Sequence, residues 1–188
     1  PESLSGPILP PLGQKIAVAE DLAFSFAYPH ILQGWKKAGA EISLFSPLKN
    51  EAPNPASDAV FLPGGYPELH AGLLSQNHTF LRGLKSSKAL IYGECGGFMV
   101  LGDALIDAQG QSHAMAGLLP LTTSFATRKL HLGYRRLMPL GGPWTKPQRG
   151  HEFHYSSIES EGKADRLFKA IDAAGDNLGL IGLKRGNV

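Results

Sequence analysis

The sequence has a single cysteine, little net charge and no long apolar run. Because Cys95 is the only cysteine among 188 residues, an internal disulfide and a zinc site built from several cysteines are excluded. The formal net charge is only +2 and the basic residues are scattered, so nucleic acid is not indicated as a partner. No apolar run has the length of a membrane span and no signal-peptide pattern opens the chain, which predicts a cytoplasmic protein.

The sequence also has no phosphate-binding loop of the form G-x-x-x-x-G-K-[ST], so ATP is not expected to bind this domain through such a loop. Two of the seven histidines lie in a motif discussed below. The other five show no metal-ligand spacing and are expected to be ordinary surface or hydrogen-bonded histidines: His30, His70, His78, His113 and His131. We therefore expect no metal and no cofactor in this domain.

Short apolar segments alternate with helical segments in the first half of the chain. Strands are predicted at 15–19, 41–45, 59–62 and 89–92, and apolar residues at helical spacing predict helices over 24–35 and around 80–84. This alternation is typical of an α/β fold, a mainly parallel sheet flanked by helices, with its site beyond the carboxyl ends of the strands. Further strand-like segments lie at 129–137, 151–157 and 178–181.

The first 13 residues have a different composition, with Pro7, Pro10 and Pro11 among small and polar residues. This composition is typical of a linker, so residues 1–13 are predicted to join the domain, residues 14–188, to an upstream segment.

The strongest signal for chemistry is the segment GECGG at 93–97, between an apolar strand and a helical run. A nucleophile on a sharp strand-to-helix turn is exposed above the sheet, and the cramped backbone there requires neighbouring glycines. We expect the helix N-terminus to favour the thiolate of Cys95, and the amide of Gly96 to face a developing oxyanion. For Glu94 an outward-facing carboxylate is at least as good an interpretation as a functional role.

A second glycine turn, LPGGYPE at 62–68, follows the third predicted strand. Such a turn is structural in most proteins. Beside a cysteine elbow it has a further use, because a second oxyanion donor is needed and the end of the neighbouring strand is where it would lie. We therefore predict that the amide of Gly65 is that donor.

A third motif, RGHEFHYS at 149–156, falls on a predicted strand. Alternation along a strand puts Glu152 and His154 on one face and His151 on the other. Glu152 could then orient His154 as a base for Cys95, and the alternative is a pair of half-exposed strand residues without a catalytic role. The spacing alone favours neither.

Together these motifs resemble one known family over nearly the whole chain, the C-terminal glutamine amidotransferase domain of cobyrinic and hydrogenobyrinic acid a,c-diamide synthases. The matching segments are DLAFSF at 21–26, GAE at 39–41, FSPL at 45–48, GGYPEL at 64–69, ECGG at 94–97, LGY at 132–134 and RGHEFHYS at 149–156. The resemblance implies a three-layer, flavodoxin-like fold of the class I glutamine amidotransferase kind, with glutamine as substrate and Cys95 as nucleophile.

The resemblance also implies partners outside this chain. Family members amidate the a and c carboxylates of a corrin precursor in cobalamin biosynthesis, and ATP and Mg²⁺ act in a separate N-terminal synthetase domain. In the wider family the catalytic histidine lies on a final strand of the form G-S-[YF]-[IL]-H, which is expected beyond Val188. That expectation would leave His154 a role in positioning.

Two other functions are compatible with the same residues. One is a cysteine hydrolase on this scaffold that cleaves γ-glutamyl or peptide bonds without transferring ammonia. The other is an interaction module that has lost its chemistry, and the intact turn around Cys95 argues against it. Turnover of glutamine compared with peptides would separate these functions.

Overall fold

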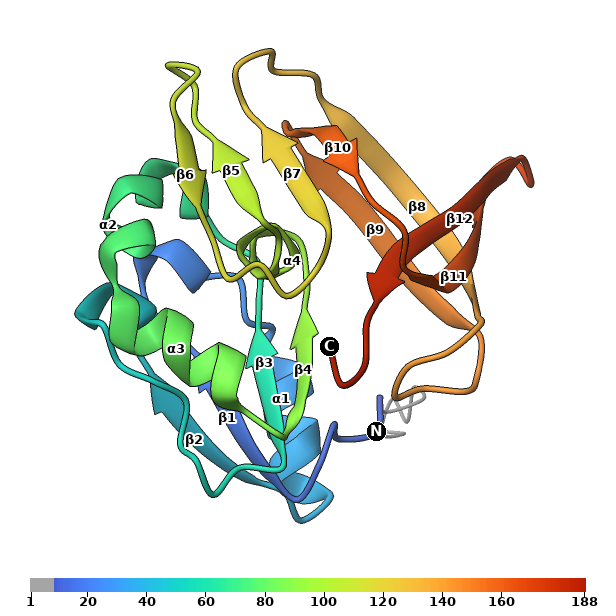
Figure 1. The fold of residues 1–188 in the computed structure, drawn as a ribbon. Helices are drawn as coiled ribbons and strands as arrows, with labels where there is room; N and C mark the ends of the chain where they lie inside the picture. The colour runs from blue at the N-terminus through green and yellow to red at the C-terminus, as the bar shows by residue number, and fades with distance from the viewer. Residues whose placement is uncertain (1–8) are drawn as a thin grey trace.

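The computed structural model describes residues 9–188, which form three four-stranded sheets with helices packed around the first of them (Figure 1). Sheet A is parallel, and its strand order is β2-β1-β3-β4. Its strands are β1 (Lys15–Ala19), β2 (Glu41–Phe45), β3 (Ala59–Leu62) and β4 (Leu90–Gly93). The first three have the predicted bounds and the fourth is displaced by one residue, so the predicted α/β fold with a parallel sheet is confirmed.

Helices cover both faces of sheet A. On one face Trp35 of α1 (Pro29–Lys37) packs with Ile16, Val18 and Phe61. The other face is covered by α2 (Ala71–Gln76), α3 (His78–Ser86) and α4 (Gly96–Leu101). The buried side chains on that side form a second apolar cluster, which includes Val60, Leu62, Leu74, Phe80, Leu84 and Leu101. Three 3₁₀ turns complete this half, at Leu22–Phe24, Pro47–Lys49 and Pro67–Leu69.

The helix predicted over 24–35 is wrong at its N-terminal end. Only α1, from Pro29, is α-helical, and Phe24 closes the separate 3₁₀ turn before it. The reason is Pro29, because the residue before a proline is driven out of the helical region. Tyr28 accordingly has φ −78° and ψ 112°. The apolar spacing of Phe24 reflects packing instead, since its ring meets Phe80 edge-on at 6.3 Å.

The second half of the chain adds two sheets that are mostly antiparallel. Sheet B has the order β10-β7-β5-β6, and sheet C, entirely antiparallel, has the order β12-β11-β8-β9. Their strands are β5 (Ala104–Ile106), β6 (Ser112–Ala114), β7 (Leu121–Ser124), β8 (His131–Pro139), β9 (Gln148–His154), β10 (Ser157–Glu161), β11 (Asp165–Asp172) and β12 (Asn177–Lys184). The sequence predicted β8, β9 and β12 in part and missed the rest.

Both described ends of the chain contact the domain. The indole N–H of Trp35 donates to the Leu9 carbonyl at 3.0 Å, and that of Trp144 donates to the Pro10 carbonyl at 2.9 Å. Residues 9–13 of the predicted linker are therefore held against the domain, whereas its residues 1–8 lie outside the described part. At the other end the amide of Ile91 on β4 donates to the Asn187 carbonyl at 2.8 Å.

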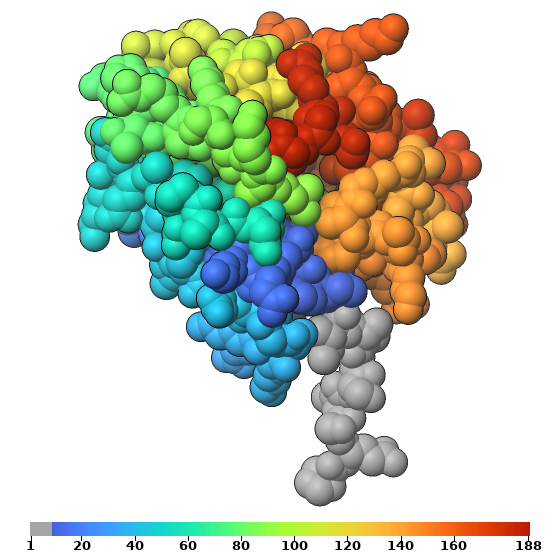
Figure 2. Space-filling model, turned by 60° about the horizontal axis from the view of Figure 1, so that its bottom comes forward, coloured from blue at the N-terminus to red at the C-terminus, as the bar shows by residue number. Residues whose placement is uncertain are grey.

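Figure 2 shows these last residues, in red, lying between the green segment that leads into β4 and the orange segment after β8. Among the described residues, no helix combines the length and the apolar character needed to cross a bilayer.

Candidate active site

Cys95 occupies the sharp turn between β4 and α4 and has φ 52° and ψ −114°. A non-glycine residue with positive φ is strained by roughly 1–3 kcal/mol and persists only where the surroundings enforce it. Here the turn is held by the amide of Glu94, which donates to the Leu62 carbonyl at 3.0 Å. Gly97 is required because a Cβ there would collide with that same carbonyl. The predicted strand-to-helix turn is therefore present, with Cys95 at its apex.

The two glycine turns meet because β3 and β4 are neighbours, with Leu62 opposite Gly93. A Cβ added to Gly96 would lie 3.3 Å from the Gly65 nitrogen, and one added to Gly65 would collide with the Ala23 carbonyl. The backbone N–H groups of Gly65 and Gly96 both interact with Cys95 and act to lower the pKa of its thiol. The structure thus brings Cys95 together with both glycines that the sequence singled out.

The amide of Gly96 at the helix N-terminus acts to lower the pKa of the Cys95 thiol, as expected, but the net direction of the shift is upward. Burial raises the pKa of the thiol, and the Glu94 and Glu68 carboxylates raise it further, against the lowering by the two glycine amides. α4 has only six residues, so its dipole adds little. The balance of these effects favours the thiol of Cys95 over the thiolate.

Two carboxylates near Cys95 make this end of sheet A acidic. Glu94 is half-buried, and that burial raises its pKa. Burial also raises the pKa of Glu68, although its backbone hydrogen bond and the positive charges of Arg128 and His70 act in the other direction. The interpretation of Glu94 as an outward-facing surface carboxylate is therefore wrong.

Tyr28 connects the Cys95 region to sheet C and was not singled out from the sequence. It follows Phe26, whose amide donates to the carbonyl of Gly64 at 3.0 Å, and burial, Glu94 and Cys95 raise its pKa. Its hydroxyl is 3.3 Å from Nε2 of His151 on β9. The available signal was Pro29, which begins α1 and leaves Tyr28 extended in front of it. The face of β9 that approaches the Cys95 site is consequently the one that carries His151.

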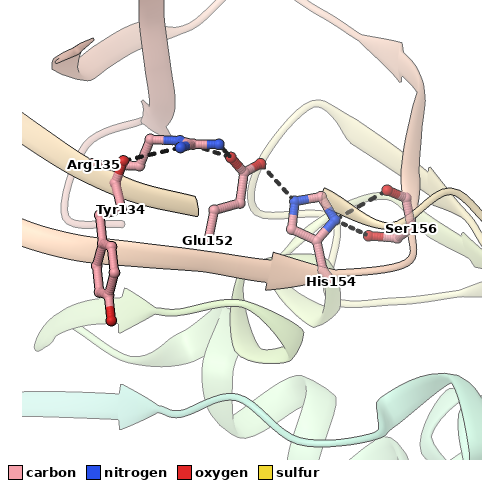
Figure 3. Close-up of polar contacts among 5 residues, drawn as sticks. All are labelled: Tyr134, Arg135, Glu152, His154 and Ser156. Carbon is pink, nitrogen blue, oxygen red and sulfur yellow. Dashed lines mark hydrogen bonds and ion pairs between the residues drawn. The ribbon is translucent and has the colours of Figure 1, made fainter. Parts of the chain in front are cut away.

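The other face of β9 carries an ordered chain of polar contacts (Figure 3). Arg135 donates through Nε to Glu152 at 2.9 Å, and Glu152 lies 2.8 Å from Nε2 of His154. The second ring nitrogen of His154 is 3.1 Å from the Ser156 carbonyl. Figure 3 shows Tyr134 pointing to the opposite side of the strands from these side chains. Glu152 and His154 are thus paired as predicted, but within residues 9–188 no hydrogen bond joins either to Cys95.

His131 belongs to the same cluster, although the sequence shows no metal-ligand spacing for it. It lies opposite His154 in the β8–β9 register, and the two rings stack with centroids 4.7 Å apart. The ligand atoms of His131, Glu152 and His154 all lie within 4.8 Å of one another, as a metal ion would require. Arg135 and the Glu152–His154 hydrogen bond already satisfy the carboxylate, so the cluster is stable as it stands.

His113 is hydrogen-bonded, as expected, because its Nε2 lies 2.7 Å from Asp107. That pair closes the turn between β5 and β6, where Asp107 also accepts the amides of Gln109 and Gln111. It is a turn contact and lies apart from the Cys95 site.

Comparison with solved structures identifies the class of fold. A crystal structure of a glutamine amidotransferase matches 82% of this chain and 79% of its own with a TM-score of 0.53 at 15% identity. A second, from Thermotoga maritima, matches 90% of this chain and 71% of its own with a TM-score of 0.53 at 14% identity. At such low identity these matches show the fold alone.

The sequence comparison is more specific. Residues 15–188 match the model of the CobB/CobQ-like glutamine amidotransferase domain, and the chain belongs to this family. It is 59% identical to the hydrogenobyrinate a,c-diamide synthase of Brucella anthropi, over 97% of this chain and 43% of the relative. The corresponding enzyme of Rhizobium meliloti is 54% identical over 96% of this chain and 43% of its own length. The chain therefore spans less than half the length of these relatives, and the predicted family is confirmed.

Proposed function

We propose that the chain is the glutaminase part of a hydrogenobyrinate a,c-diamide synthase, with Cys95 as its nucleophile. One observation supports the nucleophile most directly. Cys95 is held at positive φ on the turn between β4 and α4, and the amides of Gly65 and Gly96 act to lower the pKa of its thiol. Strain of this kind is retained at functional sites, and paired amides are the usual donors to an oxyanion.

The proposed reaction begins when the Cys95 sulfur attacks the side-chain carbonyl carbon of glutamine. The carbonyl oxygen becomes an oxyanion, which the amides of Gly65 and Gly96 stabilise. The carbon–nitrogen bond then breaks, ammonia leaves after gaining a proton, and a γ-glutamyl thioester remains. Water hydrolyses the thioester to glutamate and restores the thiol.

The carboxylates around Cys95 support a free amino acid as the substrate. Glu68 and Glu94 both act on the Cys95 thiol, so they lie close to where the substrate would bind. Free glutamine carries an α-ammonium group that such carboxylates attract, whereas an internal glutamine of a peptide has none. The same ammonium group would offset the carboxylates that raise the pKa of Cys95.

The released ammonia would serve an amidation carried out elsewhere in the full enzyme. The relatives are named for forming a diamide of hydrogenobyrinate, and this chain matches 43% of their length. A carboxylate does not react with ammonia unless it is first activated, so ATP and Mg²⁺ are implied for a synthetase part. The acceptor would be a corrin precursor with free a and c carboxylates, in cobalamin biosynthesis.

For Glu152 and His154 we propose a positioning role in sheet C. Glu152 and His154 are within hydrogen-bonding distance, as predicted. Both ring nitrogens of His154 face oxygen atoms, one of Glu152 and one of Ser156, so neither faces Cys95. Arg135 in turn holds Glu152. A base for the thioester step would then come from another histidine.

A glutamine-like diazo-ketone tests the assignment of Cys95. Because the chain has one cysteine, a single adduct in the intact mass, absent from Cys95→Ser, would locate the reaction. Excess glutamine should protect Cys95, whereas a glutamine-containing peptide should not. If iodoacetamide modifies Cys95 in the folded protein but the glutamine analogue does not, the proposed function is wrong.

A further inference from the structure

A cavity of about 620 Å³ lies on sheet C, outside the Cys95 turn. It is bounded by β8, β9 and the turn between β11 and β12, and its lining includes Tyr134, Arg136, Arg149, His151 and Ile171. Its volume is within the range of small-molecule sites, roughly 300–1,000 Å³. The proposed glutaminase reaction uses none of these residues.

Two arginines in the cavity are placed where their like charges repel each other. Arg136 and Arg149 lie directly opposite each other on β8 and β9, and like charges in this position destabilise a sheet. Both are exposed, and within residues 9–188 no carboxylate forms an ion pair with either. By contrast, the neighbouring Arg135 pairs with Glu152, and Arg166 pairs with Glu161.

The acidic residue of the cavity does not neutralise the arginine pair. Asp172 accepts the amides of Ala174 and Asp176 through Oδ1, and so closes the β11–β12 turn. An external anion is therefore the natural partner for Arg136 and Arg149, because guanidinium groups bind carboxylate and phosphate oxygens in a two-point geometry.

The remaining walls suit a flat, largely apolar molecule. The Tyr134 side chain is 76% exposed and lies opposite His151 in the β8–β9 register. Ile171 of β11 lies opposite Arg136 in the β11–β8 register. Aromatic and aliphatic side chains next to two cations provide both stacking surface and charge for one ligand.

The cavity is also connected to the Cys95 site. His151, which lines it, contacts the hydroxyl of Tyr28, and Tyr28 lies near Cys95. We propose, on the basis of the proposed function, that the cavity binds a second substrate, distinct from glutamine. Arg136 and Arg149 hold an oxyanion of this substrate, and its flat body lies against Tyr134 and His151. A carboxylate of a tetrapyrrole acceptor and a phosphate of a nucleotide share this chemistry.

Calorimetric titration of the chain with hydrogenobyrinic acid, its fully esterified form and ATP would test the site and identify the source of the oxyanion. Wild-type chain should bind one of the two anions, and the ester should bind at least about tenfold more weakly than the acid if the acid is the ligand. Each of Arg136→Gln and Arg149→Gln should weaken binding of that anion by about 10- to 100-fold, as for loss of a charge-assisted hydrogen bond. Arg82→Gln, which removes an exposed charge on α3, is the matched control and should bind as wild type does.

Thermal melting separates binding from a structural role. Because each substitution removes a repulsion, the melting temperature without ligand should stay the same or rise. The proposal is overturned if neither anion binds, if Arg136→Gln and Arg149→Gln leave binding intact, or if both lose binding only because they melt at lower temperature. Failure to label Cys95 would refute the glutaminase proposal while leaving this titration interpretable.

Discussion

Because the backbone of Cys95 is strained, we expect its glycine variant to be more stable than its alanine variant, which is the reverse of the usual order. Glycine ordinarily destabilises a folded protein by roughly 0.5–1 kcal/mol relative to alanine, because it loses more conformational freedom on folding. Cys95 has φ 52° and ψ −114°, a region that glycine adopts without strain and other residues adopt at a cost of roughly 1–3 kcal/mol. We therefore expect Cys95→Gly to be more stable than Cys95→Ala by about 1 kcal/mol.

Both variants lack the sulfur, so their difference isolates the backbone. For a chain of this size, 1 kcal/mol corresponds to about 2–4 °C in melting temperature, which differential scanning calorimetry resolves. Lys85→Gly and Lys85→Ala on the exposed face of α3 provide the matched pair at ordinary φ, where alanine should be the more stable by about 1 kcal/mol. If Cys95→Ala melts above Cys95→Gly by as much as the Lys85 pair differs, Cys95 is not strained and the argument for its role loses its basis.

Two further predictions follow from the charges. Glu94→Gln removes a carboxylate that raises the pKa of Cys95, so iodoacetamide should alkylate Cys95 about 3- to 10-fold faster at about pH 8. The rate is measured by intact mass, and Glu41→Gln is the control. An unchanged rate would contradict the electrostatic account. Burial acts to raise the pKa of Glu152, but His154 and Arg135 hold it below its usual range. A lowered carboxyl pKa stabilises the fold above the unfolded value, about 4.3, and that stability is lost as the pH falls through the folded value. The melting temperature of Glu152→Gln should therefore lie below that of wild type at about pH 7, and the gap should shrink as the pH falls below about 4.3. A gap that stays the same as the pH falls would contradict the assignment.

The sequence could predict the first half of the fold because its signals are local. Each strand of sheet A is a short apolar run ended by a turn signal, so three of the four have the predicted bounds. The glycines at 65, 96 and 97 indicated the site because close packing excludes a Cβ at these positions. The error at 24–35 arose where Pro29 overrides an apolar spacing that is otherwise helical.

The second half depends on pairing between distant residues, which periodicity does not reveal. The stacking of His131 on His154 and the facing pair Arg136 and Arg149 both follow from the β8–β9 register, which a single sequence leaves open. Tyr28 meets His151 across 123 positions of the chain. Alternation within β9 did predict that Glu152 and His154 share a face, but it could not say which face approaches Cys95.

Substitutions of His154 and His151 test which face of β9 approaches Cys95. His154 contacts Glu152, Ser156 and the His131 ring, so His154→Ala should lower the melting temperature by several degrees as these contacts are lost. Because no hydrogen bond within residues 9–188 joins it to Cys95, the rate at which a glutamine-like diazo-ketone labels Cys95 should fall less than about threefold. Loss of a general base would instead cost about 100-fold or more.

His151→Ala is the matched substitution, on the same strand but on the face that meets Tyr28. It should leave the melting temperature nearly unchanged, since His151 is exposed, and slow the labelling of Cys95 about 3- to 10-fold as Tyr28 loses its partner. Labelling rates are compared at saturating analogue, so that weaker binding is not mistaken for slower chemistry. If His154→Ala slows labelling about 100-fold while melting as wild type does, His154 is the base, and β9 must present its other face to Cys95 when substrate is bound.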